Sequence, residues 1–396
     1  MQQAPEASSA AGYQPFVAMV AGEASGDLLA GLLLTGLQAR WPGLRSAGIG
    51  GPQMQRLQFD AWWPHHKLSV HGFNWDTLRR YREIVGIRDQ LRARLLKAPP
   101  DIFVGVDAPD FNLALEADLR ATGVPTVHFV SPSVWAWRAE RMEKIRRSAD
   151  HVLCIFPFEP ALLERNGIAA TYVGHPLANV IPMEPDRAAA RHTLGLPDDI
   201  PVVAILPGSR SSEIEHLAAR FFQAALLIRQ GRGTTRFIVP AAPGHRARIE
   251  LLARASGLGP EQLRILDGQA HSALAACDVT LIASGTATLE AALFKRPMVI
   301  SYHQSWLSWQ IMRRKMLQPW VGLPNILCEE FVVPELLQDD ATPQRLARAT
   351  LDWLDAVQTD AAPLRQLRAK FVALHQQLQR DTATIAADVF QKILQS

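Results

Sequence analysis

Two aspartates that directly follow a short apolar run are the first candidates for acid–base chemistry. Asp107 and Asp110, in the segment Asp-Ala-Pro-Asp, come after the run Ile-Phe-Val-Gly-Val. Parallel α/β sheets carry their chemistry at the carboxyl ends of the strands, and one of these carboxylates can serve there as a general base. The alternative is that Asp107 only caps a turn before Pro109.

Two further segments combine small residues, hydroxyls and charge in a pattern that suits phosphate. Residues 206–210 form a Gly-Ser turn with an arginine after one apolar run, and residues 283–290 follow another. Backbone N–H groups in such turns, helix N-termini and a guanidinium all bind phosphate oxygens, and a carboxylate further on can accept from ribose hydroxyls. Ordinary N-capping is the alternative. The candidate ligands are Ser209, Arg210, Ser284, Gly285, Thr286 and Glu290.

Asp-x-Asp, the pattern with which metal-dependent sugar transferases hold a nucleotide diphosphate, does not occur in the chain. We therefore expect protein groups to neutralise a diphosphate, without a metal ion or another cofactor. The segment Gly48-Ile49-Gly50-Gly51 begins like a dinucleotide fingerprint, but Pro52 and Gln53 interrupt it. A nicotinamide cofactor is not expected.

Small and polar residues also follow the first predicted strand. Ser25 and Asp27 lie in the turn 22–27, where the backbone can approach a ligand, although Asp27 can equally cap the following helix. Trp135 and Arg138, in the segment 131–138, suit stacking on a sugar, with buried packing as the alternative. His175 is a secondary candidate for phosphate or acceptor, since a lone histidine is more often structural.

The elements that must position these residues alternate between short apolar runs and helical patterns. One series of runs begins near residue 16 and a second near residue 200, with a proline-rich seam near 182–200. This alternation predicts an α/β protein with two doubly wound parallel sheets. We expect the GT-B architecture, in which two Rossmann-like domains border a cleft: an acceptor domain 1–185, a nucleotide-sugar domain 186–362, and a C-terminal helix 363–396 that returns to the first domain.

Composition limits the class of protein. The 396 residues suit two domains, and the three cysteines form no Cys-x-x-Cys pair, which favours a reduced, cytoplasmic setting. The N-terminal segment does not resemble a signal peptide, and the first apolar run is too short to span a bilayer. The net charge of +3 gives weak support to nucleic-acid binding, and we expect none.

Basic residues and tryptophans do cluster in two segments. Residues 74–97 contain an excess of arginine near Trp62, Trp63 and Trp75, and residues 306–320 contain a second such cluster. Both suit peripheral docking on an anionic membrane surface. A solvated helix face is the alternative.

Ten segments together resemble the lipid-A-disaccharide synthase family, in that family's order, from about residue 16 to beyond 340. They are AGEASGD, GIGGPQM, DAPDFN, VSPSVWAWR, IFPFE, GHPLA, LPGSR, ASGTATLE, PMVISY and LPNI. The resemblance implies an inverting GT-B transferase that joins UDP-2,3-diacylglucosamine to 2,3-diacylglucosamine 1-phosphate at the inner face of the inner membrane of a Gram-negative bacterium. It also implies that Asp107 is the base on the acceptor 6-hydroxyl, that Arg210 and the loop 284–290 hold UDP, and that Asn325 lines the donor site.

Three departures from the family pattern concern the acceptor and acyl-chain side. Trp75 stands where the family has a glutamate, Gln58 replaces a glycine, and Asn179 replaces an aspartate. Another GT-B transferase, a UDP-GlcNAc 2-epimerase and a non-catalytic lipid- or nucleotide-binding protein remain alternatives, and a homodimer is left open.

Overall fold

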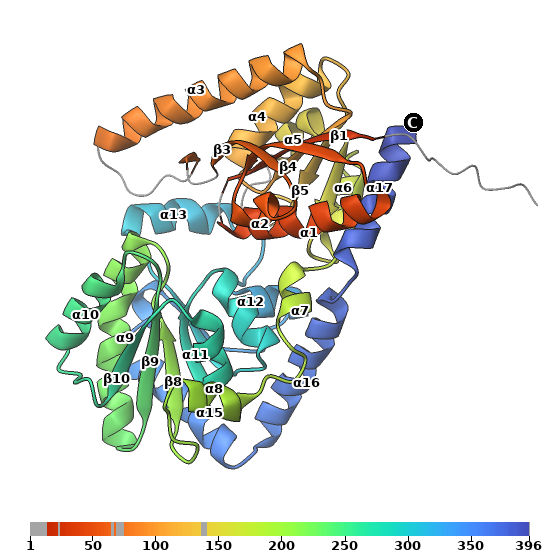
Figure 1. Ribbon diagram of the computed structural model, residues 1–396. Coiled ribbons are helices and arrows are strands. Elements are labelled where there is room, and N and C mark those ends of the chain that lie inside the picture. The colour runs from red at the N-terminus through yellow and green to blue at the C-terminus, as the bar shows by residue number, and fades with distance from the viewer. Residues whose placement is uncertain (1–13, 23, 65–66, 69–74, 136–140, 396) are drawn as a thin grey trace, which may run out of the picture. The chain divides into compact units, whose positions relative to one another are not determined.

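The chain divides into two compact units. Unit 1 comprises residues 1–176 and 378–396, and unit 2 comprises residues 177–377. The computed structural model, shown in Figure 1, describes residues 14–22, 24–64, 67–68, 75–135 and 141–395. Among these residues, none of the helices is long and apolar enough to cross a membrane.

Unit 1 contains a seven-stranded parallel sheet with the order β3-β2-β1-β4-β5-β6-β7. Its central strands are buried along their whole length, as expected for apolar runs covered by helices on both faces. The strands are β1 (Phe16–Ala21), β2 (Arg45–Gly50), β3 (Asp60–Pro64), β4 (Ile102–Val106), β5 (Thr126–Phe129), β6 (His151–Cys154) and β7 (Ala170–Tyr172).

The helices of unit 1 include the last helix of the chain, which packs on α1. In Figure 1, α17 lies beside α1, and a Cβ added to Gly36 of α1 would lie 2.4 Å from the carbonyl oxygen of Ala383. This approach requires glycine. The helices are α1 (Ala24–Arg40), α2 (Pro52–Gln55), α3 (Trp75–Lys97), α4 (Pro109–Arg120), α5 (Met142–Ser148), α6 (Glu159–Glu164) and α17 (Thr382–Gln395).

Unit 2 contains a six-stranded parallel sheet with the order β10-β9-β8-β11-β12-β13. The strands are β8 (Val202–Leu206), β9 (Arg236–Ala241), β10 (Leu263–Asp267), β11 (Val279–Ala283), β12 (Met298–Tyr302) and β13 (Glu335–Leu337). The helices are α8 (Arg187–Thr193), α9 (Ser211–Gly231), α10 (Arg246–Ala255), α11 (Ala270–Ala276), α12 (Thr286–Leu293), α13 (Trp306–Lys315), α14 (Leu323–Cys328), a 3₁₀ turn η3 (Gln338–Asp340) and α15 (Pro343–Gln358). Two helices lie at the passages between the units, α7 (Pro176–Val180) and α16 (Ala362–Leu378).

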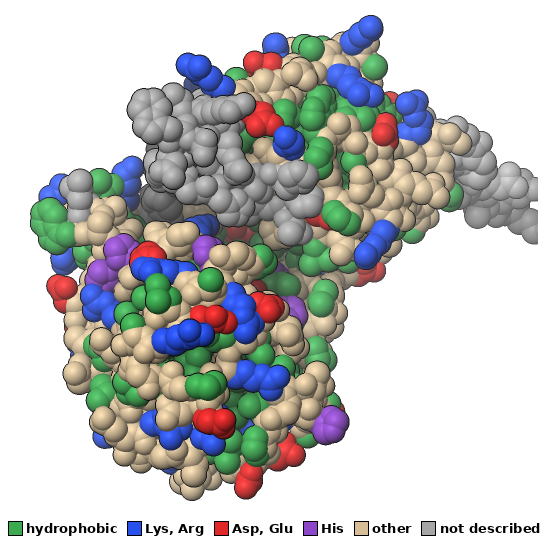
Figure 2. Space-filling view, turned by 60° about the vertical axis from the view of Figure 1, so that its left-hand side comes forward, with side chains coloured by type: hydrophobic (Ala, Val, Ile, Leu, Met, Phe, Trp, Pro, Cys, Tyr) green, Lys and Arg blue, Asp and Glu red, His purple; other side chains and the backbone are tan. Residues whose placement is uncertain are grey.

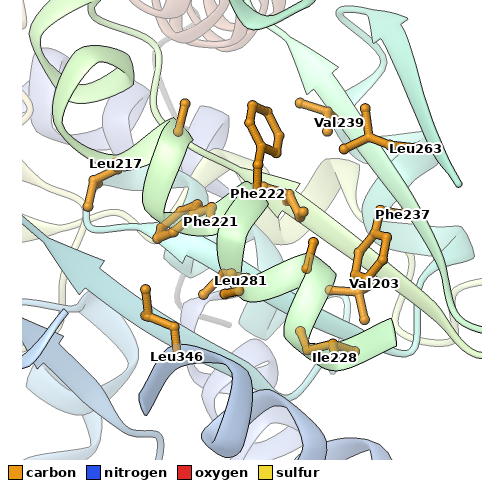
Figure 3. Close-up of a cluster of buried hydrophobic side chains, with 14 of the residues drawn as sticks. Val203, Leu217, Phe221, Phe222, Ile228, Phe237, Val239, Leu263, Leu281 and Leu346 are labelled. Carbon is orange, nitrogen blue, oxygen red and sulfur yellow. The ribbon is translucent and has the colours of Figure 1, made fainter. Parts of the chain in front are cut away.

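The core of unit 2 forms between α9, α15 and one face of the sheet. Phe221 and Phe222 are fully buried on α9, and Figure 3 shows them among side chains of β8, β9 and β11. The apolar residues of α9 recur at helical spacing, so one face of a long helix covers the strands. This packing holds the carboxyl ends of β8 and β11 side by side.

The sequence correctly predicted parallel sheets in both halves, but the structure differs from the prediction in three respects. The boundary falls between Pro176 and Leu177, earlier than the expected seam. The chain returns to unit 1 at Leu378, because α16 belongs to unit 2 through Gln377 and, of these last two helices, α17 is the one that packs on α1. Four strands, β2, β3, β7 and β13, were not predicted, and they are short or polar.

Candidate active site

The chain reverses direction across the unit 1 sheet between β1 and β4. In α/β sheets this switch point is where ligands bind, outside the carboxyl ends of the strands. The turn after β4 contains consecutive left-handed residues, Asp107 with φ of 52° and Ala108 with φ of 44°, and Val130 after β5 has φ of 76°. Such conformations are unfavourable for residues other than glycine and are concentrated at functional sites.

Asp107 is held by its backbone while its side chain is partly exposed. Its N–H donates to the carbonyl of Phe129 at 2.8 Å, and its own carbonyl accepts from the Asn112 amide at 2.8 Å. A carboxylate fixed by its main chain and open to solvent suits a base. Asp110, by contrast, is exposed at the start of α4 and forms an ion pair with Arg141 at 2.8 Å.

The turn after β1 packs against this one. A Cβ added to Gly22 would lie 3.2 Å from Cβ of Ala108, and Ser25 is exposed beside this contact at the start of α1. Asp27 is not placed as expected for a residue that binds a ligand. Its buried carboxylate accepts from the N–H groups of Gly51, Gln53 and Met54 at 2.9, 2.9 and 3.1 Å, so it caps α2 rather than presenting itself to a substrate.

Trp135 follows β5, and side chains of residues 156–159 hold its indole ring. Its indole N–H donates to Glu159 at 3.0 Å, and its ring meets Phe156 and Phe158 edge-on. Burial raises the pKa of Glu159 to about 8, although hydrogen bonds from Phe156 and Trp135 lower it. A partly exposed, fixed indole is compatible with sugar stacking. Arg138, its expected companion, lies outside the described residues.

His175 is almost fully buried, and its ring centroid lies 5.6 Å from that of Phe156. Its backbone N–H donates to the carbonyl of Leu378 at 2.9 Å, where the chain re-enters unit 1. Burial lowers the pKa of His175 to about 4, so the imidazole is neutral at physiological pH. It therefore has little surface to offer a phosphate, and the structure favours the structural alternative.

In unit 2 the switch point lies between β8 and β11, and both predicted phosphate loops follow these strands. Arg210 has a side chain that is 80% exposed. The N–H groups of Ser209 and Arg210 are not open, however, because they donate to the Glu213 carboxylate at 2.9 and 3.2 Å. Glu213 also accepts from the Arg210 guanidinium at 3.1 Å. An internal carboxylate thus occupies groups that could bind an anion.

The loop after β11 is fixed on one side and open on the other. Ser284 donates its hydroxyl to the carbonyl of Val321 at 2.8 Å, whereas Gly285 and Thr286 are exposed at the start of α12. Glu290 lies further along α12, partly buried, with its carboxylate 3.1 Å from His271. Exposed N-terminal groups of this helix remain suited to phosphate.

Asn325 does not line an open site in this structure. Its fully buried amide donates to the carbonyl of Val333 at 3.0 Å and to Glu335 at 2.8 Å, and it accepts from the N–H of Val333 at 3.0 Å. These contacts tie α14 to β13 and to the residue Val333 that precedes it. In this structure Asn325 supports the segment next to the loop at Ser284, and its place in the donor site stays a prediction.

Three acidic residues that the sequence analysis did not single out form hydrogen bonds beside the candidate site: Glu116, Glu159 and Glu213. Only Glu213 had a readable signal, since it lies three residues after Arg210 in a capping-box position. Within the part of the chain that the structure describes, His, Cys, Asp and Glu side chains form no group of three that could hold a metal ion.

The two parallel sheets with loops at both switch points define the GT-B fold, which includes glycosyltransferases and nucleotide-sugar epimerases. A UDP-GlcNAc 2-epimerase from Neisseria meningitidis bound to UDP-GlcNAc is similar, with a TM-score of 0.64 at 11% identity, covering 96% of this chain and 99% of that one. Alr3699/HepE of Anabaena, in complex with UDP and glucose, has a TM-score of 0.58 at 14% identity, covering 97% and 100%. At such identities the likeness shows the fold alone.

Sequence comparison identifies the family. The lipid-A-disaccharide synthetase family matches residues 17–390, and the chain belongs to it. A lipid-A-disaccharide synthase of Albidiferax ferrireducens is 70% identical over 379 residues, 96% of this chain and 97% of that protein. One of Verminephrobacter eiseniae is 64% identical over 378 residues, covering 96% and 97%.

Proposed function

We propose that this protein is an inverting glycosyltransferase of lipid A biosynthesis. It joins UDP-2,3-diacylglucosamine to 2,3-diacylglucosamine 1-phosphate and releases UDP, leaving a β-1,6-linked disaccharide. The family match over nearly the whole chain carries this proposal. The positions of Asp107 and Arg210, each next to the switch point of its sheet, support it.

Asp107 is the proposed general base. Its carboxylate takes the proton of the acceptor 6-hydroxyl as that oxygen attacks the anomeric carbon from the side opposite UDP. The strained turn and the contacts to Phe129 and Asn112 hold the main chain of Asp107, from which the carboxylate extends, in place. A base fixed before the substrate arrives does not have to be ordered during the reaction.

Unit 2 stabilises the negative charge that develops on departing UDP. Arg210 and the N-terminus of α12 provide fixed positive potential where diphosphate charge develops. Because Glu213 holds the Ser209 and Arg210 amides, a diphosphate there has to displace this carboxylate or bind beside it through the exposed guanidinium. Either route leaves Arg210 as the main cationic ligand.

The direct test is a two-substrate assay in which the product is identified by mass. We expect the phosphorylated disaccharide and one UDP per turnover, with and without EDTA. Absence of the disaccharide would remove the proposed function. Complete loss of activity on chelation would instead remove the metal-independent mechanism.

A membrane-docking surface is proposed on α13. Figure 2 shows acidic and basic side chains interspersed over the visible face of unit 2, so charge alone does not mark a docking surface. Trp306 and Ile311 of α13 are 74% and 54% exposed, Leu317 follows them, and the last turn contains Arg313, Arg314 and Lys315. Exposed aromatic and aliphatic residues beside cations suit the interface of an anionic bilayer.

The helix α3 supports docking less directly. Arg92 is paired with Asp118 at 2.8 Å, and the Arg94 guanidinium lies 3.7 Å from the centre of the Trp62 ring. These contacts use part of its charge within unit 1, while Arg82 is exposed. We therefore place the stronger membrane contact at α13 and propose that it holds the protein at the cytoplasmic face of the inner membrane.

Vesicle sedimentation tests the docking surface. The double variant Trp306→Ser, Ile311→Ser should bind vesicles of phosphatidylglycerol and phosphatidylethanolamine about tenfold more weakly, because the buried apolar area is lost. Leu251→Ser, at a residue 56% exposed on α10, is the matched control and should bind like the unaltered protein. Equal binding of all three proteins would remove α13 from this role.

A further inference from the structure

Three buried polar side chains lie directly behind the Asp107 turn. Asn112 and Glu116 are one turn apart on α4, and His128 is on β5; all three are fully buried. Gly105 of β4 pairs in register with Val20 of β1 on one side and with His128 on the other. The three polar residues therefore lie at the centre of the sheet, beside its switch point.

Asn112 connects this cluster to the turn. Its amide nitrogen donates to the Asp107 carbonyl at 2.8 Å and lies 3.4 Å from the carbonyls of Val106 and Val20. Three carbonyls around one nitrogen determine the orientation of the amide, since its oxygen would be repelled there. A single side chain thus holds the ends of β1 and β4 and the first residue of the strained turn.

Glu116 and His128 form the part of the cluster that does not contact the turn. Glu116 Oε1 and His128 Nδ1 are 2.7 Å apart. Burial raises the pKa of Glu116, and His128 and Lys144 lower it. One proton shared between the two side chains leaves the pair without net charge, which is the state that a buried position favours.

Gly105 is needed for this arrangement. A Cβ at that position would lie 2.0 Å from Glu116 Oε1 and 2.7 Å from Asn112 Cβ. Glu116 and Asn112 therefore both lie directly against the backbone of Gly105, one helical turn apart. Even alanine at Gly105 would displace them.

Part of the cluster has no hydrogen-bond partner. Asn112 Oδ1, Glu116 Oε2 and His128 Nε2 are buried and unpaired. Unpaired buried polar atoms are destabilising, and apolar residues of similar shape would fill this space at lower cost. Stability alone therefore does not account for polar residues here.

We propose that Asn112 is a positioning residue that holds Asp107 in its left-handed turn, and that the Glu116–His128 pair keeps Asn112 in place over Gly105. This inference rests on the proposed role of Asp107 as the base. Asn112 does not touch the substrate; it determines where the Asp107 carboxylate lies.

A double-mutant cycle tests the proposal. Asn112→Ala should lower kcat about 100-fold, the size of effect expected when a catalytic group is misplaced by about 1 Å, with KM for both substrates and UDP binding unchanged. In the Asp107→Asn background the same substitution should change kcat less than about threefold, because the group that it positions is already lost. Additive losses would overturn the proposal, since Asn112 would then act independently of Asp107.

Further variants distinguish a misplaced Asp107 from a protein that fails to fold. Ser148→Ala removes a buried hydroxyl that bonds the Leu113 carbonyl, next to Asn112 but without a contact to the Asp107 turn, and should leave kcat unchanged. Asn112→Asp removes the donor while keeping the shape, and reports on position if the alanine variant does not fold. Glu116→Gln should retain kcat within about threefold, whereas Glu116→Leu should lose as much as Asn112→Ala.

The outcomes distinguish the two proposals. Full activity of Asp107→Asn would remove the base and with it the inference. A strong loss in Asp107→Asn together with normal kcat in Asn112→Ala and Asn112→Asp would overturn only the positioning role.

Discussion

At the carboxyl edge of the unit 1 sheet, Asp107 sits in a strained turn that Asn112 holds from a buried cluster, and Trp135 is fixed by a buried glutamate. At the corresponding edge of the unit 2 sheet, Arg210 extends into solvent and the nearby amides are occupied by Glu213, a carboxylate of the chain itself. Both edges lie at a switch point of a parallel sheet.

The difference fits two kinds of chemistry. A base works through the position of one oxygen, so rigidity gained from buried hydrogen bonds is useful. A diphosphate is larger and carries its charge on several oxygens, so an exposed guanidinium and a helix N-terminus can bind it without one exact geometry. The comparison predicts that changes at unit 1 affect turnover and changes at unit 2 affect nucleotide binding.

The strongest test of this division is Asp107→Asn. Loss of a general base should lower kcat by roughly two to four orders of magnitude, with UDP affinity retained. Steady-state kinetics and calorimetry with UDP measure the two quantities. The control is Asp118→Asn, because Asp118 lies on the exposed side of α4, the helix that follows the Asp107 turn. Unchanged turnover would end the assignment of Asp107 as the base.

Arg210→Ala should have the next largest effect, on the other side of the comparison. Loss of a charge-assisted contact to phosphate should weaken UDP binding roughly 10- to 100-fold. Arg248→Ala, which breaks an exposed pair with Glu215 on the same unit, should leave UDP binding unchanged. If both variants bind UDP normally, the phosphate site lies elsewhere.

Asn325→Ala tests whether unit 2 also has a rigid support behind its loops. Because all contacts of the amide are internal, we expect a loss of about 1–3 kcal/mol in the free energy of unfolding, measured with urea. UDP affinity should change much less than in Arg210→Ala. A variant of normal stability that no longer binds UDP would restore Asn325 to the donor site.

Glu159 supports Trp135, and its expected effect is on stability rather than on turnover or UDP binding. Its pKa is raised from 4.5 to about 8 in the folded state, so the folded protein binds more protons than the unfolded chain between these values. Its contribution to stability is therefore full below pH 4.5 and is lost as the pH rises towards about 8. Glu159→Gln should flatten the decline in unfolding free energy over this window; an unchanged slope would show that Glu159 does not cause it.

Local patterns were sufficient to predict the framework of the site. The apolar runs before Asp107, Ser209 and Ser284 are all strands, and each loop follows the carboxyl end of its strand. A run of apolar, β-branched residues predicts a strand by itself. The neighbours of a strand depend on crossovers, so only the structure shows that these loops lie at the two switch points.

Side-chain partners were not predictable because they come from other segments of the fold. Asn325 is satisfied by Val333 and Glu335, and Asp27 by amides around Gly51, so neither is free to bind a ligand. A local motif shows that an aspartate or asparagine stands at a loop, but only the fold shows whether its hydrogen bonds are already made. The same holds for Glu116 and His128, whose contact with each other is visible only in the fold.

The packing of α17 on α1 affects how the chain folds during synthesis. The first helix of unit 1 needs a partner that follows all of unit 2 in the chain, residues 177–377. At a translation rate of about 5–20 residues per second, the face of α1 that packs on α17 stays uncovered for on the order of 20 to 70 seconds after α1 is made. During that interval this face is open to other chains, and removal of α17 should make the protein aggregate rather than merely lose activity.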